Sequence, residues 1–147
     1  MGKRAAAVLA ACLLLLSLCG CGDRAEGPDR SPEAAFLRSA ETALGPDLSE
    51  SYDGYEIALE EDLLVIRIWM EGTADLAACI RAGLLDRGFW ENVRKGVGGL
   101  AVAGRDFADR AGRDDLAVRV DLLNDRDREK LLLSLLDGEI LYDAVSE

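Results

Sequence analysis

Hydrophobic residues recur along the chain with two periods, which predict alternating helices and strands. Ser31-Pro32 offers a hydroxyl cap and a proline at the first helical position, so a short helix is expected to begin there. Gly45-Pro46 is expected to end it. Residues 55–60 then alternate apolar and polar positions, and residues 63–70 are β-branched and aromatic with Arg67 as their one polar member, so the two segments predict a β-hairpin.

A helical stripe follows between residues 74 and 111, with Thr73 as its expected cap and Gly112 as its stop. Because Gly88 interrupts the pattern, either one long helix or two consecutive helices fit. Each glycine in a helix interior costs about 0.5–1 kcal/mol relative to alanine. The segment should therefore be the weakest element, or it should pack closely on the sheet through its glycines, which are Gly96, Gly98, Gly99 and Gly104.

Three strands are predicted in the last third of the chain. Residues 116–122 alternate clearly, and a charged loop follows at 124–129. Residues 130–136 fit a strand or a helix; we favour a strand, because Asp137-Gly138 is a strong hairpin signal and residues 140–145 provide its partner. The predicted class is α+β: a small antiparallel sheet of about five strands, in the order ββ-α-βββ, with helices on one face and a short helix before it.

Composition and charge exclude several functions. The 147 residues carry a net charge of −11, which excludes a general affinity for nucleic acid, since that requires clustered positive charge. The chain contains no histidine, which excludes histidine general bases, Ser-His-Asp and Cys-His nucleophiles and histidine-ligated metals. No cofactor is predicted, and the chain is expected not to be an enzyme.

The N-terminus has the pattern of an export signal. Lys3 and Arg4 precede an apolar run that is shorter than the roughly 20 residues of a spanning helix. The sequence Leu18-Cys19-Gly20-Cys21 resembles the lipobox of bacterial lipoproteins. This resemblance implies cleavage after Gly20 and a diacylglyceryl group on Cys21. An acceptor at Cys19 fits less well, and an ordinary secretory signal or an uncleaved membrane tail are the alternatives.

These features divide the chain into a signal peptide at 1–20, a flexible tether at 21–31 and one domain at 32–147. Removal of the signal takes away Lys3 and Arg4 and no acidic residue, which changes the net charge from −11 to −13. Of the four cysteines only Cys79 would then remain without a lipid. Its apolar neighbours predict a buried thiol rather than a reactive one.

A few residue groups could carry chemistry or binding. The alternating acids Asp125, Asp127 and Glu129 are weak candidates for a calcium site, although arginines lie between them and the calcium-loop glycine is missing. For Trp69 and Trp90 we favour core or half-buried packing, with a ligand or partner face as the alternative. The motif from Gly96 to Ala101 matches a dinucleotide pattern but lacks the preceding strand, and the acidic clusters at residues 60–62 and 114–115 are expected to be solvated turns.

The C-terminal part, with Leu122-Leu123-Asn124-Asp125, Leu131-Leu132-Leu133-Ser134 and residues 137–143, resembles the ends of small uncharacterised lipoprotein domains of Gram-positive bacteria. The resemblance implies that an Asn-Asp turn, a strand and an Asp-Gly hairpin close a small sheet. It implies a surface location and assigns no catalytic residue.

The expected function is a non-catalytic binding or accessory domain held on the outer face of the cytoplasmic membrane by its lipid, with an envelope protein as its partner. A small-molecule carrier, a carboxylate-based hydrolase and a structural lipoprotein are the alternatives. A concave pocket of several hundred Å³ with converging polar groups would favour the carrier or the hydrolase, and a layer without one would favour the accessory domain.

Overall fold

A computed structural model describes residues 29–146 of the chain. The leader, Cys21 and most of the expected tether lie outside these described residues. The compact unit begins at Ser31, whose hydroxyl oxygen accepts a hydrogen bond of 3.1 Å from the backbone N–H of Ala34. Ser31 is therefore the helix cap that the sequence predicts.

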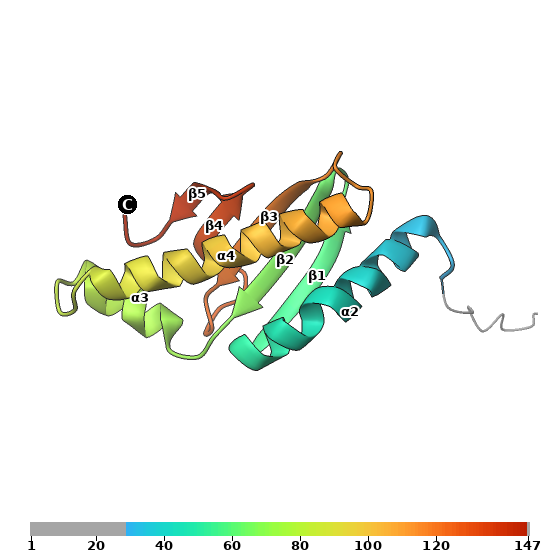
Figure 1. Cartoon of the computed structure of the whole chain (residues 1–147). Helices are drawn as coiled ribbons and strands as arrows, with labels where there is room; N and C mark the ends of the chain where they lie inside the picture. The colour runs from blue at the N-terminus through green and yellow to red at the C-terminus, as the bar shows by residue number, and fades with distance from the viewer. Residues whose placement is uncertain (1–28, 147) are drawn as a thin grey trace, which may run out of the picture. The chain divides into compact units, whose positions relative to one another are not determined.

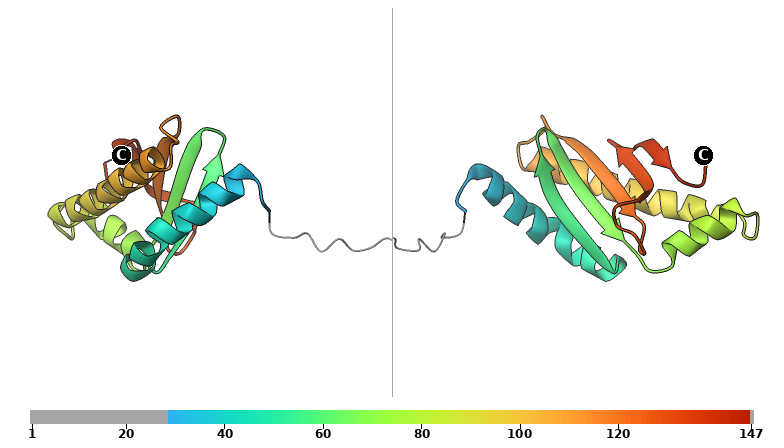
Figure 2. Two further views of the ribbon diagram at one scale, coloured as in Figure 1. Left: turned by 45° about the vertical axis from the view of Figure 1, so that its right-hand side comes forward. Right: turned by 180° about the vertical axis from the view of Figure 1, so that it is seen from behind.

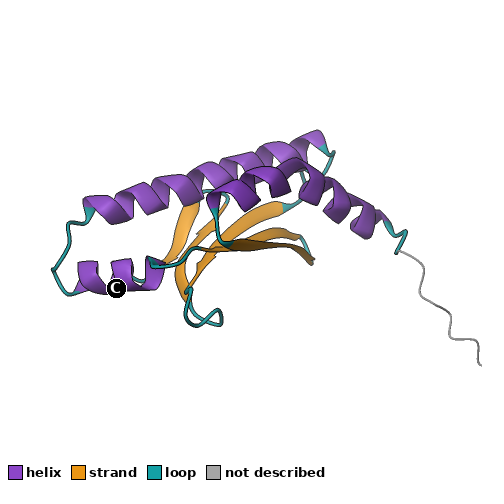
Figure 3. Cartoon of the chain, turned by 90° about the horizontal axis from the view of Figure 1, so that it is seen from below, coloured by secondary structure: helices purple, strands orange, loops and turns teal. Residues whose placement is uncertain are grey.

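The described residues form three helices and five strands, which confirms the predicted α+β class and its element order (Figure 1). The elements are α2 (Pro32–Ser51), β1 (Gly54–Glu60), β2 (Leu63–Trp69), α3 (Thr73–Arg81), α4 (Gly88–Arg110), β3 (Ala117–Leu123), β4 (Leu131–Leu136) and β5 (Glu139–Asp143). Helices α2 and α4 lie on the same side of the sheet, as Figure 3 shows from below. The expectation of helices on one face is thus correct.

The strands follow one another across the sheet in chain order, and one pairing differs from the prediction. The pairs β1–β2, β3–β4 and β4–β5 are antiparallel, as hairpins and short loops require. The pair β2–β3 is parallel, so the sheet is mixed rather than antiparallel. The reason is the connection through α3 and α4, which returns the chain to the start of the neighbouring strand.

Helix α2 does not end at Gly45-Pro46, so the expectation of a short helix is wrong. It runs for 20 residues and contains Pro46 in its interior. An interior proline costs about 3 kcal/mol. The helix continues because Leu48, beyond the proline, is 1% exposed in the core, and because Gly45 leaves room for the ring of Tyr55, whose hydroxyl oxygen would lie 2.8 Å from a Cβ at this position. Tertiary packing thus outweighs a local stop signal.

The long helical stripe is divided into α3 and α4. Its helical spacing predicts a buried face made of Phe89, Val93, Val97, Leu100 and Phe107. Val97 is buried, and Val93, Leu100 and Phe107 pack against the core, but Phe89 is 54% exposed and Trp90 is buried in its place. Helix α4 approaches the sheet most closely at Gly104, where a Cβ would lie 2.9 Å from Val118 and 3.1 Å from Ile66. Packing through a glycine is therefore correct for this one position.

The C-terminal hairpin forms as predicted. Residues 131–136 are a strand, and Asp137 and Gly138 both have left-handed φ angles, of 48° and 86°. Two such residues in succession match the twist of an antiparallel pair. Asp137 also accepts a hydrogen bond of 2.9 Å from the backbone N–H of Val118, which joins the turn to β3.

The helix-free face of the sheet carries a network of charges. Ile66 and Val118 lie under α4, so the alternation of side chains places Arg67 and Arg119 on the opposite face. There Glu60 forms ion pairs with both arginines, and the side chain of Arg67 holds the pKa of Glu60 below its usual value by hydrogen bonding. Glu60 is thus an ion-pair partner rather than a solvated turn residue.

Candidate functional site

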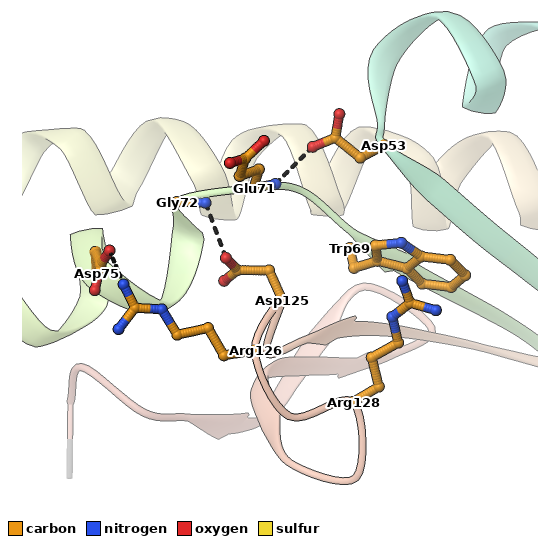
Figure 4. A pocket seen from close by; sticks show the side chains of 8 residues that line it. All are labelled: Asp53, Trp69, Glu71, Gly72, Asp75, Asp125, Arg126 and Arg128. Carbon is orange, nitrogen blue, oxygen red and sulfur yellow. Dashed lines mark hydrogen bonds and ion pairs between the residues drawn. The ribbon is translucent and has the colours of Figure 1, made fainter.

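The candidate site is a pocket of about 560 Å³ beside the ends of β1 and β2, closed on one side by the loop after β3 (Figure 4). Its volume lies within the range of about 300–1,000 Å³ that is typical of ligand pockets. The lining residues are Asp53, Trp69, Glu71, Gly72, Asp75, Asp125, Arg126 and Arg128. A concave, polar-lined pocket of several hundred Å³ is the feature that favours a small-molecule carrier or a hydrolase over an accessory domain without a pocket.

Trp69 provides the aromatic surface of the pocket. It is the last residue of β2 and is half-buried. Its neighbour across the hairpin is Gly54, where a Cβ would lie only 2.2 Å from the indole ring, so glycine is needed for the ring to lie against β1. The guanidinium carbon of Arg128 lies 4.1 Å from the ring centroid, a distance typical of a cation–π contact.

Asp125 closes the pocket by capping helix α3 from a distant part of the chain. Its carboxylate accepts hydrogen bonds from the backbone N–H groups of Gly72 at 3.0 Å and Ala74 at 2.8 Å. Burial raises the pKa of Asp125, but these backbone hydrogen bonds outweigh it, and the pKa is lowered. The expected cap, Thr73, is instead the first helical residue, and its hydroxyl donates to the carbonyl of Met70.

The remaining charges leave the pocket with a negative balance. Arg126 forms an ion pair with Asp75, and Asp53 accepts a hydrogen bond of 2.6 Å from the backbone N–H of Glu71. The carboxylate of Glu71 has no ion pair or hydrogen bond with the described residues. Four carboxylates thus face two guanidinium groups in this pocket, and the negative balance favours a cationic ligand.

The three acidic candidates for a metal site are not brought together by the fold. Asp125 caps α3, whereas Asp127 binds Lys130 at 2.8 Å and accepts from the backbone N–H of Glu129. Within residues 29–146 the structure contains no group of three or more cysteine or acidic side chains arranged to hold a metal ion. Of these candidates only Asp125 reaches the pocket.

Trp90 packs in the core, which is the favoured interpretation of the sequence, and it does not form a ligand face. Its ring is buried in the core, and its indole N–H donates a hydrogen bond of 2.9 Å to Asp143. The other oxygen of Asp143 binds Arg94 in an ion pair. Burial raises the pKa of Asp143, but hydrogen bonds from the backbone N–H of Val145, from Arg94 and from Trp90 outweigh it and lower the pKa.

The other sequence candidates lie apart from the pocket. Cys79 is half-buried in α3 rather than fully buried, and it has no disulfide. The glycine motif at 96–101 lies inside α4, where a helix rather than a phosphate-binding loop is present. Asp115 pairs with Arg113 at 2.9 Å, so the acidic cluster at 114–115 contributes to an exposed ion pair.

The sequence indicated two of the eight lining residues, Trp69 and Asp125. It gave no sign of Asp53, Glu71 or Arg128, because these come from three separate connections that meet only in the fold. The one usable signal was the pairing of Gly54 with Trp69 in the predicted hairpin, since a glycine opposite a tryptophan leaves room for the ring.

Comparisons with known proteins add no relative to this picture. No family model, no curated protein and no solved structure matches the chain. Among the helices of residues 29–146, none has the length and apolar character that crossing a bilayer requires. The chemistry of the Trp69 pocket is therefore the structural observation that bears on function.

Proposed function

We propose that this protein is an exported lipoprotein, anchored through Cys21 to the outer face of the cytoplasmic membrane, whose α+β unit is a non-catalytic module that binds cationic groups in the Trp69 pocket. The anchor is supported by the lipobox-like sequence that ends at Cys21. Two acyl chains hold a protein stably at a bilayer, at about 0.8 kcal/mol per buried CH₂. The negatively charged mature chain would not need electrostatic attraction to remain there.

One observation supports the cationic ligand: the guanidinium of Arg128 lies over the Trp69 ring in a pocket with excess negative charge. The guanidinium of Arg128 is a cation of the kind that we propose as the ligand, and it already lies on the Trp69 ring. An ammonium or guanidinium from outside would replace Arg128 on the ring, in a pocket that Glu71 also lines. Such a group could belong to a small molecule or to a basic segment of an envelope protein.

A binding role is better supported than the alternative of a carboxylate-based hydrolase. A general acid at neutral pH needs a carboxyl group whose pKa is raised. Asp125, which lines this pocket, has a lowered pKa, because it accepts hydrogen bonds from the backbone N–H groups at the start of a helix. The arrangement favours stable negative charge, which suits recognition of a cation.

Titration with arginine amide tests the ligand class. We expect the indole N–H signal of Trp69 in a nitrogen–proton NMR spectrum to move, while that of Trp90, which is buried against Asp143, stays in place. The Arg128→Ala variant should bind about two- to fivefold more tightly, because the ligand no longer displaces a cation–π contact of about 0.5–1 kcal/mol. Trp69→Leu should abolish the response.

The control variant is Arg110→Ala, which removes an exposed arginine of α4 outside the pocket and should leave binding unchanged. Weaker binding by Arg128→Ala, or a response to inorganic phosphate instead of arginine amide, would show that the pocket binds anions and would refute the proposal. A second titration with a short arginine-rich peptide separates the two sources: tighter binding than arginine amide indicates a protein partner.

The anchor is tested by replacing its acceptor residue. We expect Cys21→Ser to lose labelling by a radioactive fatty acid and to move from the membrane to the soluble fraction, because serine has no thiol to carry the diacylglyceryl group through a thioether bond. Cys19→Ser is the matched control and should retain both properties. Full membrane retention and labelling of Cys21→Ser would contradict the assignment.

A further inference from the structure

The connection between α3 and α4 has an unusual surface for an acidic protein. All nine residues from 81 to 89 are exposed, and three of them are large and apolar. Leu84 is 74% exposed, Phe89 is 54% exposed and Leu85 is 42% exposed. The connection projects at the end of the unit opposite the start of α2 (Figures 1 and 2). We call residues 81–89 the apolar tip.

The cations beside the apolar tip are not neutralised. Residues 81–95 contain four basic and two acidic side chains, although the whole chain is strongly acidic. The acids are engaged: Asp86 accepts a hydrogen bond of 2.6 Å from the backbone N–H of Gly88, and Glu91 pairs with Arg94 at 2.9 Å. No ion pair to a described residue is formed by the remaining cations, which are Arg81, Arg87 and Lys95.

Exposed apolar side chains bordered by unpaired cations are complementary to an anionic lipid surface. Apolar groups enter the boundary between headgroups and acyl chains, and each lysine or arginine near an anionic surface contributes about 1 kcal/mol. A large exposed apolar patch on a folded domain usually marks a site of interaction with a protein or a membrane. The positive charge around the apolar tip is opposite in sign to the charge of the rest of the chain. An anionic membrane would therefore attract this end of the unit and repel the remainder.

We infer that the apolar tip is a second membrane contact, which inserts into a bilayer that contains anionic lipid and lays the unit on the surface. The inference rests on the proposed anchoring for its orientation. Residues 21–30 can span at most about 35 Å, so the start of α2 stays within that distance of the anchored surface, and a unit that lies along the surface can place both of its ends against it. The anchor and the tip can therefore reach one surface together, where tethering makes even a weak contact effective.

The test replaces the natural anchor, so that its outcome is independent of acylation. Residues 22–147, which include the complete compact unit, carry an N-terminal hexahistidine tag and are bound to vesicles through a nickel-chelating lipid. In a Cys79→Ala background, Ala82→Cys places an environment-sensitive fluorophore in the tip. Val102→Cys, on the exposed part of α4, is the matched site outside it.

On vesicles of phosphatidylglycerol and phosphatidylcholine, we expect emission at residue 82 to rise about twofold and shift to the blue, as on entry into an apolar environment, and emission at residue 102 to stay constant. The rise should be lost in the triple variant L84S/L85S/F89S. It should be lost in R81E/R87E/K95E and reduced at high salt, because exposed charges are screened.

Equal emission at residues 82 and 102, or no rise at either, would overturn the inference. So would a rise on pure phosphatidylcholine that grows with the density of protein, since this would indicate contact between two copies. If emission at residue 82 does not rise but Cys21→Ser leaves the membrane in cells, the tip proposal is refuted and the lipid anchor still stands. If emission at residue 82 rises but Cys21→Ser stays on the membrane, the anchor proposal is refuted and the membrane contact of the tip still stands.

Discussion

Replacement of Asp143 by alanine should lower the free energy of unfolding by about 3–5 kcal/mol, which is typical for breaking a buried ion pair. The side chain is 4% exposed and joins the C-terminal strand to α4 through Arg94 and Trp90. Without the carboxylate, the buried indole N–H of Trp90 loses its acceptor, and Arg94 keeps only its more exposed partners Glu91 and Ser146. Urea unfolding followed by Trp90 fluorescence measures the loss.

Two variants separate the origin of this effect. Asp143→Asn keeps the shape but loses the charge, and we expect it to cost about 2 kcal/mol, the value for hydrogen bonds to a charged group. Asp106→Ala removes an exposed carboxylate that lies 3.9 Å from Arg110 on α4, and it should change stability by less than about 0.5 kcal/mol. Equal losses for Asp143→Ala and Asp106→Ala would contradict the role of the buried pair.

The same carboxylate makes stability depend on pH. The pKa of Asp143 is lowered in the folded state, so its contribution is complete above the unfolded value of about 3.9 and is lost as the pH falls through the folded pKa. Asp125 acts in the same direction. The wild type should therefore lose stability below about pH 4, and Asp143→Ala should show a shallower decline there.

Combined replacement of Gly96, Gly98 and Gly99 by alanine should stabilise the domain by about 2 kcal/mol, which raises the melting temperature by roughly 8 °C. A Cβ at any of these positions meets no atom within 4 Å, so each substitution gains helix propensity without a clash. Calorimetry of the triple variant measures the shift.

Gly104→Ala is the matched control and should have the opposite sign. Its Cβ would lie 2.9 Å from Val118 and 3.1 Å from Ile66, so overpacking of about 1–3 kcal/mol exceeds the gain in propensity. A melting temperature for Gly104→Ala that rises as in the triple variant would show that α4 does not depend on this close approach to the sheet.

The sequence by itself determined the elements whose signals are local. The Ser31-Pro32 start of α2, the Asp137-Gly138 hairpin, the stop at Gly112 and the strand β3 all appear as predicted. These features depend on the φ angles, caps and side-chain periods of neighbouring residues, which are visible in a short stretch of chain. The α+β class followed from their order.

Only the tertiary structure decided the features that depend on residues far apart in the chain. Pro46 remains inside a helix because Leu48 is buried beyond it, and α3 is capped by Asp125, about fifty residues later in the chain, rather than by Thr73. The parallel pairing of β2 with β3 and the meeting of Trp69 with Arg128 belong to the same group. Burial and long-range hydrogen bonds set these outcomes, and their free energies exceed the local preferences that the sequence displays.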